Sequence, residues 1–369
     1  MLKAVLDKID AQDLLEREDM VYLLGLRDPD DIRTLHERAY RVKEEQVGKT
    51  TYFRGLIELS NICVKDCYYC GIRKSNCDTT RYQMAEQEII EAACWAHQQN
   101  YGSIVLQAGE RSDPQFVDFI ESVLKRIREQ CCGELGITLS LGEQPEEHYR
   151  RWFEAGAHRY LLRIETSNKA LYTTLHPPDH HFDTRKACLN RLRKTGYQVG
   201  TGVMIGLPGQ TYHDLVDDIL FFQDQDIDMI GMGPFLLHAN TPLGVQHAHT
   251  QPSADEQLRL GLNMIAVTRL VMKDVNIAAT TALQALRHDG REMGLQAGAN
   301  IIMPNVTDTK YRASYQLYQN KPSIDENASL CRSRLEHRIY DIGEEIGYRK
   351  WGDSPRFFSR SIKAEAASR

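Results

Sequence analysis

The sequence predicts a (β/α)8 barrel of the TIM type, in which eight parallel strands alternate with helices around a closed sheet. From residue 51 onwards, strand-like apolar runs alternate with amphipathic stretches eight times, at a spacing of roughly 25–45 residues. No low-complexity linker divides the 369 residues into two domains. An open, doubly wound sheet is the alternative, but eight units in unbroken succession favour closure.

Each strand is expected where a short apolar run precedes polar or glycine-rich residues. The predicted strands are 53–60, 103–108, 136–141, 159–165, 198–206, 228–234, 276–282 and 299–304. Between them, stretches such as "AEQEIIEAACWAHQQ" and "PQFVDFIESVLKRIREQ" repeat apolar residues at three-and-four spacing. This spacing is typical of helices that cover a sheet.

Additional segments are predicted at both ends of the barrel. Near the N-terminus, Leu2, Val5 and Ile9 share one helical face, and "DIRTLHERAYRVKEEQVG" continues the helical spacing. Near the C-terminus, "SRLEHRIYDIGEEIGYRK" has a helical pattern, and a basic tail without a regular pattern follows. The predicted parts are a helical extension (1–48), the barrel (49–321), and a C-terminal helix and tail that pack on the barrel (322–369).

Composition excludes several classes of partner. The chain has 42% hydrophobic and 26% charged residues and a formal net charge of −6, which gives no reason to expect nucleic acid or an anionic membrane surface. No run approaches the ~18 consecutive apolar residues of a membrane-spanning helix. Charges throughout the first residues argue against a signal peptide. Nine cysteines, an odd number, do not suggest a disulfide framework, so we expect a reducing cytoplasm.

The strongest chemical motif is a cysteine loop directly after the first strand. Cys63, Cys67 and Cys70 are spaced C-x3-C-x2-C, and the aromatic Tyr69 precedes the last thiol. Three thiolates on so short a loop can hold a [4Fe–4S] cluster and leave one iron open, because there is no fourth cysteine in the loop. A structural zinc site would need four closed ligands, and no second pair follows nearby. Three unrelated core cysteines are the remaining alternative.

These residues resemble the radical S-adenosylmethionine (SAM) superfamily, and in particular its branch of HydE-type maturases of [FeFe]-hydrogenase, relatives of biotin synthase and methylornithine synthase. The resemblance covers about residues 54–320. The stretches that carry it are "IELSNICVKDCYYCGIRKSN", "IVLQAGE", "TLSLGEQP", "RYLLRIETSN", "MIGLPGQT", "DMIGMGPF", "IAATTAL", "GANIIMPN" and "YQLYQNK".

The resemblance implies a reaction and a substrate. The open iron of the cluster would be chelated by SAM, whose reductive cleavage would give methionine and a 5′-deoxyadenosyl radical. The substrate would be an iron–cysteine complex bearing CO and cyanide, on the route to the di-iron subcluster of the hydrogenase. An electron donor of ferredoxin or flavodoxin type, and other hydrogenase maturases, are the implied partners. A methylornithine-synthase-like mutase, a non-enzymatic iron–sulfur electron carrier and a zinc-binding interaction module stay open as alternatives.

Polar residues at the carboxyl ends of the strands are the candidate ligand contacts, because barrel active sites form at that edge. On the fourth strand Arg163 and Glu165 are two residues apart, so both should point to one side. A buried ion pair there is seldom present for stability alone. Polar residues at strand ends also often form hydrogen bonds with the loop backbone, and methionines often fill cores. A structural role of this kind is the alternative for each candidate.

The resemblance assigns roles to these positions. Gly109 matches the stretch whose backbone contacts the amino group of SAM, with Ala108 in place of a first glycine. Glu165 would accept hydrogen bonds from SAM, while Arg163 and Arg185 would hold carboxylates. The other implied cofactor or cavity contacts are Tyr69, Gln107, Glu110, Ser140, Met204, Met229, Thr280, Thr281, Met303 and Tyr315.

One departure from the family concerns a further cysteine cluster that several members carry. At the corresponding positions this sequence has Ser323, Cys331 and Arg334, so one of three thiols is present. We therefore predict no second cluster.

Overall fold

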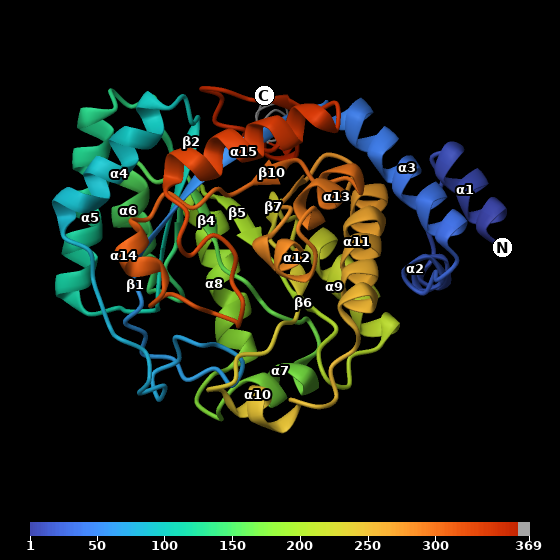
Figure 1. Cartoon of the computed structure of the whole chain (residues 1–369), viewed down its shortest axis with the longest axis horizontal. Coiled ribbons are helices and arrows are strands. Elements are labelled where there is room, and N and C mark those ends of the chain that lie inside the picture. Colours follow the sequence, from blue (N-terminus) through green and yellow to red (C-terminus); the bar gives the residue numbers. More distant parts are fainter. Residues whose placement is uncertain (361–369) are drawn as a thin grey trace.

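The computed structural model describes residues 1–360, and these contain a closed parallel barrel (Figure 1). Neighbouring strands pair in the order β10-β1-β2-β3-β4-β5-β7-β9. Ala278 directly after β9 and Ile301 in β10 form a parallel bridge, which joins the two ends of this order and closes the barrel. The prediction of a closed barrel, and not an open sheet, is therefore confirmed. The barrel strands are β1 (Thr50–Ser60), β2 (Ser103–Ala108), β3 (Gly136–Ser140), β4 (Arg159–Leu161), β5 (Gln198–Thr201), β7 (Met229–Ile230), β9 (Asn276–Ile277) and β10 (Ile301–Ile302).

Amphipathic helices cover the outside of the barrel, as α5 illustrates. Pro114 occupies its first turn, and the Asp113 side chain caps it by accepting the backbone N–H of Phe116 at 3.0 Å. Its buried residues, Phe116 to Ile127, recur at helical spacing against the sheet. The helices that follow the strands are α4 (Glu86–Gln98), α5 (Pro114–Gln130), α6 (Glu146–Glu154), α7 (Lys169–Leu175), α8 (Phe182–Thr195), α9 (Tyr212–Asp224), α10 (Pro242–Gln246), α11 (Ala254–Val271), α12 (Thr281–Leu286), α13 (Gly290–Gln296) and α14 (Thr309–Arg312).

Several strands end earlier than the sequence predicts. The stretches 198–206 and 228–234 are each interrupted, and their second halves form a separate pair, β6 (Met204–Ile205) with β8 (Gly233–Pro234). The interruption lies where two backbones approach closely: a Cβ on Gly202 would overlap the carbonyl oxygen of Gly231. The residues freed from the ladder line the carboxyl edge of the barrel.

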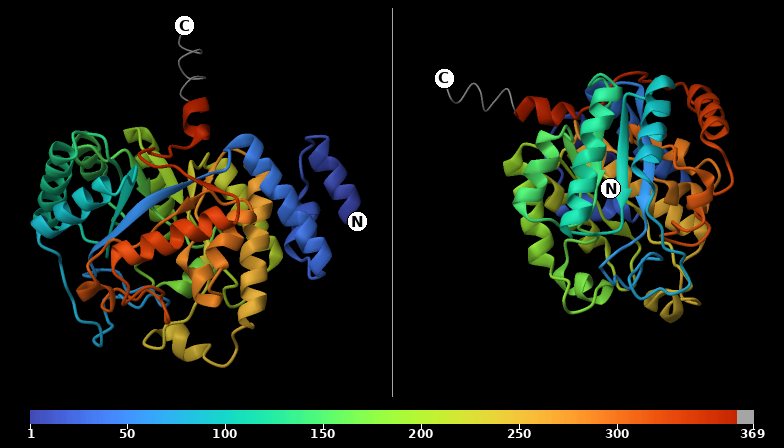
Figure 2. Two further views of the ribbon diagram at one scale, coloured as in Figure 1. Left: turned by 45° about the horizontal axis from the view of Figure 1, so that its top comes forward. Right: turned by 90° about the vertical axis from the view of Figure 1, so that its left-hand side faces the viewer.

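Three N-terminal helices lie against one side of the barrel, beside α11 (Figures 1 and 2). They are α1 (Leu2–Asp10), α2 (Arg17–Leu24) and α3 (Pro29–Gln46), so the predicted helical character of this segment is confirmed. An ion pair between the fully buried side chains of Lys43 and Glu344 joins α3 to the C-terminal segment. Thr51 donates a hydrogen bond of 3.0 Å to the same carboxylate.

The C-terminal segment corrects part of the prediction. Helix α15 (Ala328–Asp341) ends before Gly343, whose φ of +78° no longer fits a helix, although the pattern was extended to residue 350. A strand that was not predicted, β11 (Glu345–Ile346), pairs in parallel with the start of β1. The tail is also not patternless throughout, because 355–360 are helical and Asp353 pairs with Arg159 beneath the barrel. Residues 361–369 lie outside the described part.

The division into three parts at 48/49 and 321/322 stays a prediction. Among the helices of residues 1–360, none combines the length and the apolar character that crossing a bilayer would require.

Candidate active site

A cavity of about 310 Å³ lies at the carboxyl edge of the barrel and gathers the predicted site residues. Its walls come from segments that follow nearly every strand. The predicted residues that line it are Cys63, Cys67, Tyr69, Cys70, Gln107, Gly109, Glu110, Ser140, Arg163, Glu165, Arg185, Met204, Thr280, Thr281, Met303 and Tyr315.

Met229 is the exception: it does not line this cavity, and its implied cofactor contact stays a prediction. Its side chain lines a separate, smaller cavity deeper in the barrel, together with Arg54 and Thr138. The Arg54 guanidinium lies 2.9 Å from the Met229 sulfur. The alternation of a strand predicts which face a residue occupies, but it does not predict how deep in the barrel that residue lies.

The cysteine loop is held in place by backbone hydrogen bonds to three distant segments. The N–H of Val64 donates to the carbonyl of Glu110 at 2.9 Å, and that of Tyr68 to Leu175 at 2.8 Å. After the last thiol, the Gly71 N–H donates to Leu317 at 2.9 Å. The loop conformation is therefore fixed by the barrel before any ligand binds.

The three thiols lie half-buried in the cavity wall, and this partial burial is the main cause of their raised pKa values. The pKa of Cys67 is raised to about 12, and those of Cys63 and Cys70 are raised too. The Cys63 sulfur accepts a hydrogen bond of 3.3 Å from the Glu110 backbone. Protonated thiols become ligands only when a metal displaces their protons, so loading of this loop should release protons.

The spacing of the thiols suits a cluster better than one ion. In residues 1–360, no three His, Cys, Asp or Glu side chains converge as ligands of a single metal ion would. A cubane requires no such convergence, because each thiolate binds a different iron. The donor set and its enclosed position therefore fit a [4Fe–4S] cluster.

Gly109 is required by the cysteine loop itself. A Cβ at this position would overlap the carbonyl oxygen of Ile62 and lie 2.8 Å from the Cβ of Cys63. Its N–H also donates to Ser60 at 2.9 Å, so the backbone has little freedom to move away. Close approach of a ligand was the predicted reason for a glycine here; the structure shows a second reason, the contact with the loop.

A Gly109→Ala substitution should therefore displace Cys63 and lower the iron bound per chain by more than half after anaerobic reconstitution. Iron and acid-labile sulfide analysis would measure this effect. Gly133→Ala is the matched control. A Cβ there meets open space, so the substitution introduces only the backbone strain of a side chain at a positive φ. Full iron loading in Gly109→Ala would contradict this explanation of the glycine.

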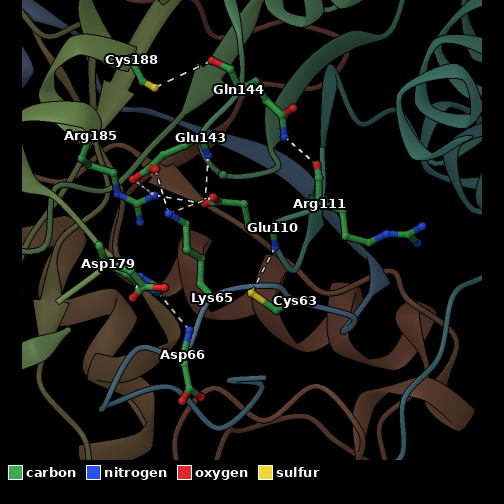
Figure 3. Close-up of polar contacts among 12 residues, drawn as sticks. Cys63, Lys65, Asp66, Glu110, Arg111, Glu143, Gln144, Asp179, Arg185 and Cys188 are labelled. Carbon is green, nitrogen blue, oxygen red and sulfur yellow. Dashed lines mark hydrogen bonds and ion pairs between the residues drawn. The ribbon is translucent and has the colours of Figure 1, made fainter. Parts of the chain in front are cut away.

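Four charged side chains brace the loop against the second and third strands (Figure 3). Lys65 lies 2.9 Å from Glu143 and 3.3 Å from Glu110. Arg185, on α8, lies 3.3 Å and 3.4 Å from the same two carboxylates. Burial raises the pKa of Glu110, although both cations oppose this. The two cations balance the two anions, so this group of four charged side chains can be buried at limited cost.

The ion pair that was predicted on the fourth strand is present, but it lies beyond the end of β4. Arg163 and Glu165 are 3.0 Å apart, and Arg163 also donates to the carbonyl of Val203 at 2.9 Å. Glu165 has a φ of +67°, a strained conformation for a residue with a side chain. Within the described residues, the Arg163 Nε has no hydrogen-bond partner, and the Glu165 carboxylate is paired with Arg163 alone among the side chains.

Hydroxyl groups and an amide form further contacts along the cavity wall. Gln107 donates to the Tyr315 hydroxyl at 3.2 Å, and the hydroxyls of Thr281 and Tyr318 lie 2.8 Å apart. Ser323 and Cys331, two of the three positions compared with the family's second cluster, also line this cavity. The third, Arg334, is exposed and pairs with Glu326.

Sequence reasoning missed a buried ion pair at the cavity wall, between Glu58 on β1 and Lys321. Glu58 also accepts from Asn305 at 3.0 Å, and Lys321 donates to the carbonyl of Tyr315 at 2.9 Å. A carboxylate inside the apolar run "GLIELS" was the available signal, because a buried strand carboxylate needs a cation. Its partner, far along the chain in a loop, had no such signal.

Comparison with known proteins identifies the class to which this fold and site belong. The model of the radical SAM superfamily matches residues 57–222, which include the end of β1, the cysteine loop and the four barrel strands β2 to β5. Over 357 residues the chain is 41% identical to the [FeFe] hydrogenase maturase subunit HydE of Thermotoga maritima, covering 96% of this chain and 98% of that protein. The chain belongs to the radical SAM superfamily and is a radical SAM enzyme.

Two solved structures share the barrel. A methylornithine synthase structure matches with a TM-score of 0.78 at 22% identity, covering 94% of this chain and 98% of that one. The hydrogenase maturase HydG of Carboxydothermus hydrogenoformans matches with a TM-score of 0.79 at 17% identity, covering 96% and 81%. At these identities the structures establish the fold. Membership of the superfamily implies a [4Fe–4S] cluster and SAM.

Proposed function

We propose that this enzyme uses SAM to act on an iron–cysteine complex bearing CO and cyanide, as a step in building the di-iron subcluster of [FeFe]-hydrogenase. The observation that carries the proposal is the 41% identity to the maturase subunit from Thermotoga maritima over nearly the whole of both chains. Similarity limited to the cysteine loop would support only the superfamily.

Cys63, Cys67 and Cys70 would hold the [4Fe–4S] cluster, as the only thiols of their short loop. With SAM bound, the cluster supplies the electron that cleaves the sulfonium to methionine and a 5′-deoxyadenosyl radical. The chain contributes position and a concave wall: the loop is tied to three segments, and the cavity surrounds the cysteines with side chains that would limit the access of water once ligands fill it. Enclosure matters because a carbon radical that escaped would abstract hydrogen from the protein.

The free hydrogen-bonding atoms around the cysteine loop suit the two ends of SAM. The Glu165 carboxylate, paired with Arg163 at 3.0 Å, keeps lone pairs that would accept from the amine or the ribose hydroxyls. The Nε atoms of Arg185 and Arg163 have no hydrogen-bond partner among the described residues. Either guanidinium could bind a carboxylate. Gln107, Glu110, Ser140, Met204 and Tyr69 complete this part of the wall.

The segments after the seventh and eighth strands would complete the cofactor and cavity wall, with Tyr315 near SAM. Thr280, Thr281, Met303 and Tyr315 line the cavity there. The proposal includes one cluster, held by the loop cysteines, and an electron donor of ferredoxin or flavodoxin type. The enzyme would work in the cytoplasm. Other hydrogenase maturases are the proposed partners. None of these partners requires a membrane or nucleic acid.

The test offers the reduced, SAM-loaded enzyme either the iron–cysteine dicarbonyl cyanide complex or lysine. The proposal predicts that only the iron complex is consumed, and that it increases the yield of 5′-deoxyadenosine above that of enzyme and SAM alone. Consumption of lysine with formation of a branched amino acid would instead assign the enzyme to the mutases, whose barrel it shares. The Cys67→Ser variant controls for reactions that do not require the cluster.

A further inference from the structure

Asp218 is a fully buried carboxylate that the proposed reaction does not use. It lies on α9, outside the set of residues that line the cavity. Its Oδ1 accepts two short hydrogen bonds from Ser167, at 2.6 Å from the backbone N–H and at 2.7 Å from the hydroxyl. Its Oδ2 has no hydrogen-bond partner within residues 1–360. Burying a carboxylate costs free energy, and the two hydrogen bonds from Ser167 offset part of that cost.

The turn that Asp218 holds begins with the strained residue of the cavity wall. Glu165, two residues before Ser167, has a φ of +67°. A residue with a side chain keeps such a conformation only where its surroundings fix it. The Glu165 backbone is fixed on one side, because its N–H donates to Gly202 at 3.0 Å and its carbonyl accepts from Met204 at 2.9 Å. On the other side, the turn is held by the hydrogen bonds from Ser167 to Asp218.

A second carboxylate of α9 extends this contact by one residue. Asp214 and Asp218 are four residues apart and share one face of the helix. The side-chain amide of Asn168 donates to Asp214 at 2.7 Å. The other oxygen of Asp214 accepts the N–H of Thr211, at the start of α9, at 2.7 Å. Helix α9 therefore holds two consecutive residues of the turn that follows Glu165.

The contact with Ser167 does not require the charge of the carboxylate. Burial is the main cause that raises the pKa of Asp218 to about 7. Asp214 and Asp217 act in the same direction, and the hydrogen bonds from Ser167 act against it. A proton would sit on Oδ2, which has no hydrogen bond to lose, and Oδ1 would still accept both bonds. A neutral amide with its oxygen in the place of Oδ1 should therefore hold the turn as well.

We propose that Asp218 is a positioning residue of this enzyme, which acts through Ser167 to hold the turn that presents Glu165 to the cavity. Asp218 does not line the cavity, so its effect on a ligand is exerted through the conformation of that turn. The contact of Glu165 with SAM rests on the proposed function. The hold on the turn rests on the two hydrogen bonds from Ser167.

The experiment compares Asp218→Leu and Asp218→Asn with the parent chain, each with its cluster reconstituted and without reductant, so that SAM is not cleaved. Equilibrium dialysis with labelled SAM measures affinity, and amide hydrogen exchange of residues 162–170 without SAM reports on the turn. The proposal predicts that Asp218→Leu speeds exchange and weakens SAM binding by about tenfold or more, because a displaced contact loses its geometry. Asp218→Asn should match the parent chain in both measurements. Unchanged exchange or unchanged affinity in Asp218→Leu would overturn the proposal.

Two controls separate positioning from general damage. Asp217→Asn removes the neighbouring carboxylate of α9, which is exposed and pairs with Arg17 at 2.7 Å, and should change neither measurement. The iron content of Asp218→Leu should equal that of the parent chain, because the cysteine loop is held by other segments. Lower iron in Asp218→Leu, or weaker SAM binding in Asp217→Asn, would count against a positioning role.

Ser167→Ala provides the second test if Asp218→Leu does not fold, which thermal unfolding would show. It removes the hydroxyl bond to Asp218, keeps the backbone bond, and should weaken SAM binding severalfold. Unchanged SAM affinity in Ser167→Ala would then overturn the proposal.

Glu165→Ala distinguishes failure of this inference from failure of the proposed function. If Glu165→Ala binds SAM as tightly as the parent chain does, the proposed contact of Glu165 fails, and the positioning role fails with it. If Glu165→Ala binds SAM weakly while Asp218→Leu binds it normally, the positioning role alone fails. Weak binding in both variants, with faster exchange of the turn in Asp218→Leu, is the result that the proposal predicts.

Discussion

Replacing Cys67 with serine should reduce 5′-deoxyadenosine formation to background and lower the iron content of the reconstituted chain. Partners that only orient a metal ligand cost about 10–100-fold when they are removed, so loss of a ligand itself should cost more than that. The loop offers no replacement thiol, since its other two cysteines are already used. Iron analysis and product chromatography on the same sample would measure both effects.

Cys77→Ser is the matched control for this prediction. Cys77 follows the loop by seven residues and is exposed, outside the set of residues that line the cavity. It should retain full iron loading and full activity. Normal cleavage of SAM by Cys67→Ser would contradict the assignment of the cluster to this loop, and equal losses in both variants would point to general damage.

Replacing Lys321 with methionine should have the largest expected effect on stability among the cavity residues. Glu58 is 1% exposed, and its ion pair with Lys321 would be lost, which leaves a buried carboxylate with the Asn305 amide as its remaining side-chain partner. Removing one member of a buried pair costs about 3–5 kcal/mol. Thermal unfolding of the anaerobic, cluster-loaded protein should show a clearly lower melting temperature.

The second substitution Glu58→Gln tests the cause of that effect. Glutamine removes the uncompensated charge and can still accept the hydrogen bond from Asn305, so the double variant should recover most of the lost stability. A double variant as unstable as Lys321→Met would show that packing of the lysine chain, and not the charge of Glu58, was responsible. Lys310→Met is a control, because that lysine pairs with Glu88 at the surface and should matter little.

Much of this architecture could be predicted because its causes are local. The alternation of strands and helices is written into short windows of sequence, and so is the cysteine loop, whose three thiols lie within eight residues. The pairing of Arg163 with Glu165 also followed from their spacing, although the backbone reaches it through a left-handed conformation beyond the strand. Local spacing therefore predicted contacts within one segment.

Contacts between distant segments could not be predicted in the same way. Glu58 and Lys321 are 263 residues apart, so no local spacing relates them. Strand β11 pairs with β1 through two residues, too few to produce a pattern.

The arrangement links structure to chemistry through enclosure. The cysteine loop, the braced charges behind it and the ion pair of Arg163 with Glu165 occupy one part of the cavity wall. The hydroxyls of Thr281 and Tyr318 occupy the part formed after the seventh strand. A radical generated at the first part could reach a ligand held at the second without meeting solvent, which is the requirement of the proposed reaction.

The most direct test of the central claim is the electron paramagnetic resonance spectrum of the dithionite-reduced protein with and without SAM. The account predicts about four irons per chain, as a [4Fe–4S] cluster contains, and a reduced-cluster signal that changes when SAM is added. That change would show SAM bound at an open iron of the cluster. An unchanged signal, or a colourless protein that retains zinc, would contradict the assignment of the three cysteines and with it the proposed chemistry.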